Sequence, residues 1–131
     1  MSIQAAVAAG RRAAQALMTD TCTITHVTGT TTDDLTGLVT QQRATRYAGA
    51  CRIQAPAAQG QRADVGEATV TVLRMQLQLP VAGTELVARG DQVVVTASAG
   101  DAALVGRVWV VRDLAHKSHA TARRMTIEEV T

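Results

Sequence analysis

The chain has 131 residues, of which 47% are hydrophobic, and a net charge of +2 at pH 7. This is the length of a single domain, residues 1–131, which can bury a hydrophobic core and fold without disulfide bonds. So small a net charge does not by itself imply nucleic-acid binding. No apolar run reaches the roughly 18 residues that a membrane span needs. We therefore expect a soluble protein that is cytoplasmic when made.

The apolar residues are mostly Val, Ala, Leu and Ile, and Trp109 and Tyr47 are the only aromatics. Such small and β-branched side chains suit packed sheets. Twelve of the 13 basic residues are Arg, and Lys117 is the only Lys. Arg suits interfaces where a planar guanidinium meets carboxylates or phosphates, although GC-rich coding produces the same bias.

The first 19 residues predict one N-terminal helix. They are rich in Ala, contain no Pro, and place Ile3, Val7, Ala14 and Leu17 roughly along one stripe. The polar side of this helix carries Arg11 and Arg12. Because Ala side chains permit close approach, the helix can lie against its own sheet or dock on a neighbouring subunit.

From Thr21 the pattern changes to period 2, which predicts a first strand that carries Cys22 and Ile24. A polar turn cluster at 28–37 then joins this strand to a second one at 38–45, as a hairpin with a long tip. Residues 47–54 predict a further, separate strand.

Residues 55–67 have no convincing periodicity, and we expect a mobile loop there. The cleanest strand pattern follows at 67–80, where Leu77 and Leu79 share a face. Residues 90–130 predict three consecutive antiparallel strands, the first with Val93, Val95 and Ala97 on one face.

The predicted fold is mainly β. We expect a small antiparallel β-barrel or sandwich of about six or seven strands over residues 20–131, with one N-terminal helix and long loops. Closing the sheet would deal with its exposed edges.

The sequence offers little chemistry. Cys22 and Cys51 could pair in an oxidising compartment, but no secretory signal precedes them, so we expect reduced, buried thiols. His116 and His119 flank a turn and lack the spacing of a metal site. No nucleophile, carboxylate pair or phosphate-binding loop is recognisable. We therefore predict no enzyme activity, no metal and no cofactor.

The order of short motifs resembles the head-tail connector proteins of long-tailed bacteriophages, and more narrowly their head-closure, or stopper, group. The motifs are the helix, Asp20 to Ile24, Asp34 to Gly37, Tyr47 to Arg52, a long loop, a strand ending in Leu79-Pro80, Gly90 to Val93, and Gly106 to Val111. The segment from Leu104 to Arg124 is the closest match. The resemblance covers nearly the whole chain.

This resemblance implies a structural virion protein of the phage neck, assembled in the host cytoplasm. Such a protein forms a homo-oligomeric ring of about six or twelve copies. The ring would dock on the portal or adaptor above and meet tail-terminator or tail-tube proteins below. It would surround the passing double-stranded DNA and retain the packaged genome until the tail joins. No membrane is involved.

The candidate contacts between subunits or between rings are polar or charged residues in segments that we expect to be exposed. The loop residues Arg62 and Asp64 correspond in position to a loop that reaches neighbouring rings in the resembled proteins. The full set is Arg11, Arg12, Asp33, Asp34, Gln59, Arg62, Asp64, Glu67, Arg123 and Arg124.

Two alternatives stay open. A neck adaptor or a tail-terminator protein would share the barrel and differ in which ring it touches. A nucleic-acid-binding β-barrel is also conceivable, but the chain lacks interleaved aromatics for base stacking.

Overall fold

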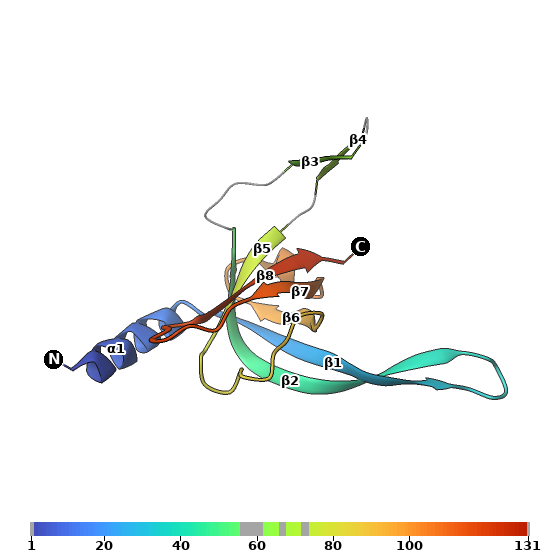
Figure 1. Cartoon of the computed structure of the whole chain (residues 1–131), viewed down its shortest axis with the longest axis horizontal. Helices are drawn as coiled ribbons and strands as arrows, with labels where there is room; N and C mark the ends of the chain where they lie inside the picture. Colours follow the sequence, from blue (N-terminus) through green and yellow to red (C-terminus); the bar gives the residue numbers. More distant parts are fainter. Residues whose placement is uncertain (1, 56–61, 66–67, 72–73, 131) are drawn as a thin grey trace.

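The computed structural model describes residues 2–55, 62–65, 68–71 and 74–130. One helix precedes eight strands, and six of these strands close into a small antiparallel barrel in the order β1-β2-β5-β8-β7-β6 (Figure 1). The predicted fold class is thus confirmed. The elements are α1 (Ile3–Ala16), β1 (Asp20–Thr32), β2 (Val39–Gln54), β3 (Arg62–Val65), β4 (Ala68–Thr71), β5 (Arg74–Leu79), β6 (Gln92–Ser98), the short 3-10 helix η1 (Ala102–Leu104), β7 (Val108–Leu114) and β8 (Arg123–Glu129).

The barrel closes because β1 pairs on both of its edges. Residues 20–25 pair with β2 on one side, from Asp20 opposite Cys51 to Thr25 opposite Thr45. On the other side the same residues pair with β6, from Asp20 opposite Ser98 to Thr25 opposite Gln92. The sheet therefore has no free edge along residues 20–25, and the backbone groups that an open edge would expose are hydrogen-bonded.

The core fills the barrel with alternate side chains from every strand. These side chains are aliphatic or sulfur-containing except for Trp109, whose fully buried indole is the largest group in the core. The cluster comprises Cys22, Ile24, Cys51, Leu77, Leu79, Val87, Val93, Val95, Trp109, Val111, Met125 and Ile127. Both cysteines are free and buried, as predicted. The Cys22 thiol is hydrogen-bonded to that of Cys51, and this contact together with burial raises the pKa of Cys22.

The predicted break between strands at 38–45 and 47–54 is wrong, because both belong to β2. The pairing with β1 passes from Thr45 opposite Thr25 to Tyr47 opposite Ile24. Arg46 is the extra residue of a β-bulge, which bends a strand without ending it.

The segment predicted as a structureless loop, 55–67, is partly ordered. Residues 62–65 form β3, which pairs with β4 as a separate two-stranded sheet. The expected single strand at 67–80 is also wrong, because β4 turns back on β3 while β5 joins the barrel. Pairing between residues so close in the chain requires little loop-closure entropy. The predicted mobility concerns mainly residues 56–61 and 66–67, which lie outside the described residues.

A second bulge explains why Ala97 is exposed although it was expected to share a buried face with Val93 and Val95. Cys22 lies opposite Val95, but Thr21 lies opposite Ala97, so Thr96 is the extra residue. One extra residue reverses the alternation of side chains, so Ala97 points outward.

Helix α1 lies outside the barrel and has no buried residue. The Ser2 side chain caps it by accepting a hydrogen bond from the Ala5 N–H at 3.1 Å. Arg11 joins it to the loop between β7 and β8, because Arg11 Nε donates to the Ala120 carbonyl oxygen at 3.0 Å. The helix also lies close to this loop at Gly10, where an added Cβ would lie 2.6 Å from Thr121 Cγ2.

A first prediction concerns the core. Replacing Ile127, which is 0% exposed, by Ala should lower the free energy of unfolding by about 2–5 kcal/mol, because a cavity remains. The control Val39→Ala, at a side chain that is 64% exposed, should change it by less than about 0.5 kcal/mol. Urea unfolding followed by Trp109 fluorescence measures both values, and equal values would contradict the buried position of Ile127.

A second prediction concerns Gly10. In an exposed helix Gly→Ala usually stabilises by about 0.5–1 kcal/mol, but here the methyl group would collide with Thr121. We expect Gly10→Ala to speed amide hydrogen exchange in α1, and to slow it when Thr121→Ser removes the colliding Cγ2. Thr121→Ser alone serves as the control. Faster exchange in both backgrounds would mean that the collision is not the cause.

Candidate subunit-interaction surface

Strands β1 and β2 continue past the barrel as a two-stranded ribbon, which we define as residues 26–44. Beyond Thr25, β1 pairs with β2 alone, from His26 opposite Ala44 to Thr32 opposite Val39. Figure 1 shows the ribbon projecting from one end of the barrel, while α1 projects from the other end. The ribbon is therefore held to the rest of the molecule only at its base.

Both faces of the ribbon are open to solvent over its outer part, since residues 30–44 are all exposed. Four large apolar side chains are among its exposed ones, namely Val27, Leu35, Leu38 and Val39. An isolated two-stranded hairpin is at best marginally stable in water. The ribbon is therefore the candidate surface for contacts with other chains.

The tip of the ribbon is an ordered acidic turn. The Asp33 N–H donates to the Leu38 carbonyl oxygen, and the Gly37 N–H donates to the Asp33 carbonyl oxygen, both at 2.8 Å. The Asp33 carboxylate accepts the Leu35 N–H at 2.9 Å. This bond, with further ones from Thr36, lowers the pKa of Asp33. Asp33 therefore holds the turn together, while the side chain of Asp34 is exposed beside it.

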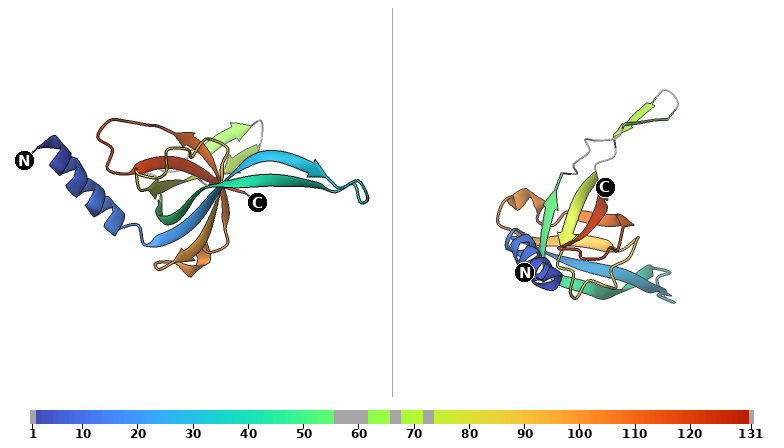
Figure 2. Two further views of the ribbon diagram at one scale, coloured as in Figure 1. Left: turned by 90° about the horizontal axis from the view of Figure 1, so that it is seen from below. Right: turned by 60° about the vertical axis from the view of Figure 1, so that its left-hand side comes forward.

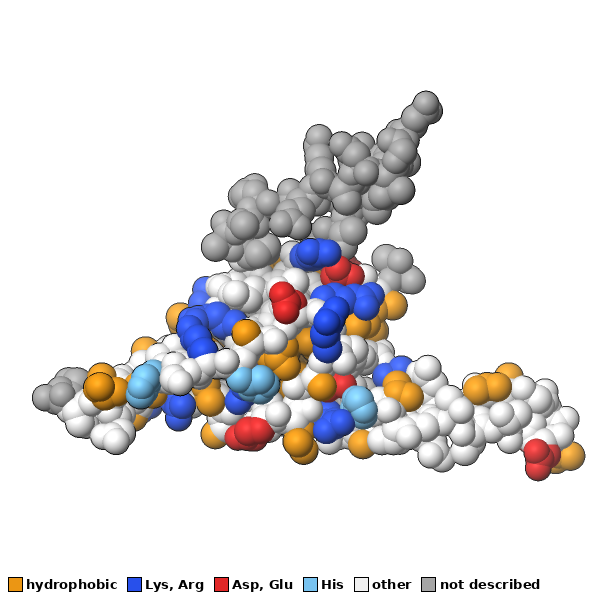
Figure 3. All heavy atoms as spheres, in the orientation of Figure 1, with side chains coloured by type: hydrophobic (Ala, Val, Ile, Leu, Met, Phe, Trp, Pro, Cys, Tyr) orange, Lys and Arg blue, Asp and Glu red, His pale blue; other side chains and the backbone are white. Residues whose placement is uncertain are grey.

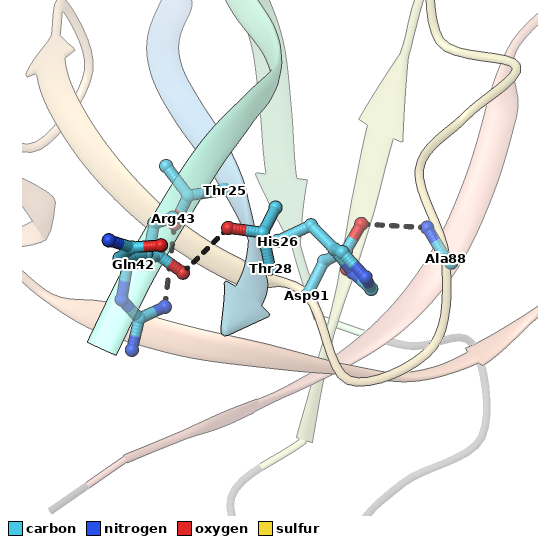
Figure 4. A network of polar contacts seen from close by, with 7 residues as sticks. All are labelled: Thr25, His26, Thr28, Gln42, Arg43, Ala88 and Asp91. Carbon is cyan, nitrogen blue, oxygen red and sulfur yellow. Dashed lines mark hydrogen bonds and ion pairs between the residues drawn. The ribbon is translucent and has the colours of Figure 1, made fainter. Parts of the chain in front are cut away.

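A polar contact between His26 and Asp91 holds the base of the ribbon (Figure 4). His26 Nδ1 lies 2.6 Å from Oδ1 of Asp91, whose side chain is fully buried. The other carboxylate oxygen, Oδ2, accepts the Ala88 N–H at 2.9 Å. This arrangement joins the ribbon to the segment before β6. The sequence showed Asp91 only as part of a turn, because nothing local indicates its burial.

The opposite end of the barrel carries a basic pocket, which we define by its lining: Val81, Ala115, His116, Lys117, Ala120, Ala122, Arg123 and Arg124. Its volume is about 280 Å³. It lies between the loop that joins β7 to β8 and the start of β8. Because the same loop contacts Arg11 of α1, the pocket and the helix are at the same end of the molecule.

The structure places six of the ten predicted contact residues at two ends of the molecule. Arg11 is half-buried and bonded to the loop, whereas Arg12 is exposed. Arg124 is exposed, but Arg123 is only 8% exposed, so Arg123 is not a simple surface contact. These four lie near the pocket end, and Asp33 and Asp34 lie at the ribbon tip. Figure 3 shows acidic side chains beside hydrophobic ones at that tip.

The remaining predicted contacts are in or near the β3–β4 hairpin, which stands away from the barrel (Figure 1). Arg62 and Asp64 belong to β3, opposite Thr71 and Thr69 of β4. Gln59 and Glu67 lie outside the described residues.

Among the described residues, no three His, Cys, Asp or Glu side chains gather where they could hold a metal ion. Over the same part of the chain, no helix combines the length and apolar character needed to cross a membrane. The features that stand out are thus surfaces: a projecting acidic ribbon, an exposed helix and a basic pocket.

These features define a small closed-barrel protein from which an exposed helix and an exposed two-stranded ribbon project. The model of a family described as a family of unknown function, DUF6093, matches residues 10–128, and the chain belongs to this family. No curated protein and no solved structure matches the chain.

A third prediction tests the base of the ribbon. Asp91→Ala removes both carboxylate oxygens, so His26 Nδ1 and the Ala88 N–H both lose their partner. We expect the free energy of unfolding to fall by about 1–3 kcal/mol, and amide exchange to rise in residues 26–44. The control Asp34→Ala, at the exposed tip, should leave the free energy of unfolding and the amide exchange of the ribbon unchanged. Stability equal to that of the unmodified protein would show that the buried carboxylate does not hold the ribbon.

Proposed function

We propose that this protein is a structural subunit of the phage neck, a head-closure ring that docks on the portal or adaptor and retains packaged DNA until the tail joins. The observation that carries the proposal is the division of the fold into a closed, well-packed barrel and exposed elements at its opposite ends. The order of sequence motifs supports it independently, through their resemblance to head-tail connectors.

The division of the fold into a closed barrel and projecting elements suits a ring subunit. A barrel whose edges are all paired is stable alone and does not aggregate through open strands. Projecting elements can then reach the subunits on either side. In a ring each subunit uses one surface as donor and a different one as acceptor, which requires distinct surfaces such as the ribbon and the pocket end. Contacts repeated around the ring add up without any single tight site.

The proposed partners follow from this role. They are other copies of the chain, the portal or adaptor on one side, tail-terminator or tail-tube proteins on the other, and DNA in the channel. The same division of the fold is compatible with an adaptor or a tail terminator in the same neck, so the experiment must distinguish these layers.

A fourth prediction supplies that test. In the phage that carries this gene, expression is switched off and the particles are viewed by electron microscopy. We expect heads that lose their DNA, together with complete separate tails, because filled heads would have no closure and tails no attachment point. A plasmid copy of the gene should restore intact virions.

Two results would contradict head closure. Tails of irregular length would indicate a terminator, since an uncapped tube has no fixed end. Normal infectious virions would rule out any essential role in the neck.

A further inference from the structure

We propose that the acidic tip of the ribbon of one copy docks into the basic pocket of the next copy. This inference rests on the proposed ring function and names the surfaces that would join its subunits. It is argued from the charge of the pocket, the composition of the tip, and their positions in the molecule.

The pocket is strongly basic. Three cationic side chains, Lys117, Arg123 and Arg124, line it together with His116, and among the described residues no acidic side chain does. The rest of the lining is apolar, from Val81 and three alanines. A concave site with apolar walls and convergent cationic groups favours a ligand that carries both a carboxylate and an aliphatic group.

Hydrogen bonds within the chain fix the position of Arg123 in the pocket, unlike that of a mobile surface charge. Its Nε donates to Thr84 Oγ1 at 2.8 Å, its Nη2 donates to the Val81 carbonyl oxygen at 3.1 Å, and its Nη1 contacts His116 Nδ1. These three bonds hold the guanidinium rigidly with neutral partners.

A guanidinium has five N–H donors, so two remain after these bonds. None of the ion pairs in the described part of the chain involves Arg123. Glu85 is near enough for Arg123 to help lower its pKa, but this is the smallest of the causes, after backbone hydrogen bonds. The largely buried guanidinium of Arg123 thus has no carboxylate partner in the described part of the chain. It is available to bind a carboxylate of another chain.

The ribbon tip has the matching chemistry. It presents Asp33 and Asp34 next to Leu35, which is 95% exposed. The lowered pKa of Asp33 keeps its carboxylate charged to lower pH than an ordinary Asp. Since the turn is ordered by its own hydrogen bonds, little conformational entropy is lost on docking.

The two surfaces lie at opposite ends of the molecule. Figures 1 and 2 both show the ribbon tip at the far end from α1 and from the loop between β7 and β8. A tip therefore cannot reach the pocket of its own chain. It can reach the pocket of a neighbour, which gives a head-to-tail contact that closes into a ring when the rotation per subunit permits.

The test reverses the charge of each surface in turn. One variant, Asp33→Asn with Asp34→Arg, makes the tip basic, and the Asn keeps an oxygen that can accept the Leu35 N–H. The other, Lys117→Glu with Arg124→Glu, makes the pocket acidic and leaves the buried Arg123 in place. Self-association is measured by sedimentation velocity at low salt, and folding is checked by Trp109 fluorescence.

We expect each variant alone to self-associate at least about tenfold more weakly than the unmodified protein, since like charges then face each other. An equimolar mixture should associate again, because a basic tip meets an acidic pocket and an acidic tip meets a basic one. The matched control Arg89→Glu, at an exposed arginine outside the pocket, should associate like the unmodified protein.

Three results would overturn the inference: an unmodified protein that stays monomeric, variants that associate as tightly as it does, or a mixture that fails to recover. The proposed function is judged separately, by whether the unmodified gene is needed for intact virions. If it is needed and the tip variant also restores virions, head closure stands and this contact is wrong.

Discussion

The double pairing of β1 is the constraint on which the rest of the structure depends. Its first six residues, 20–25, bond to β2 and β6 at once and so close the barrel. The closed wall encloses the largely aliphatic core around Trp109. Past Thr25 the pairing with β6 ends, and the same two strands that formed the wall become the free ribbon.

Buried polar groups lie where the projecting elements meet the barrel. Asp91 is enclosed at the base of the ribbon, and Arg123 is enclosed beneath the loop that contacts α1. Burying a charge is costly unless hydrogen bonds satisfy it, and each of these groups has several. Each group therefore holds a particular geometry: Asp91 the base of the ribbon, and Arg123 the shape of the basic pocket.

The buried core and the exposed projecting elements thus belong to different parts of the chain. In the described part of the chain, the barrel strands contain most of the buried apolar side chains, whereas α1 and the ribbon contain none. An exposed helix and an exposed hairpin gain little from their own packing. In the proposed ring, neighbouring copies would supply the burial that these elements lack in the single chain.

The sequence by itself determined the helix, the mainly β class and the strands that line the core, because a period of 3.6 or 2 is a local property of the chain. It predicted the three strands after Gly90 and the free thiols of Cys22 and Cys51. It also identified charged residues of the ribbon tip and of the basic pocket, but not that these two surfaces lie at opposite ends of the molecule.

Only the tertiary structure decided the bulges at Arg46 and Thr96, because a bulge is defined by the residues of the partner strand. The same holds for the burial of Asp91 and Arg123, which depends on what distant segments place around them. The positions of the ribbon tip and the basic pocket at opposite ends follow from the closure of the barrel. No spacing along the chain encodes that closure, since it joins residues 20–25 to residues some seventy positions away.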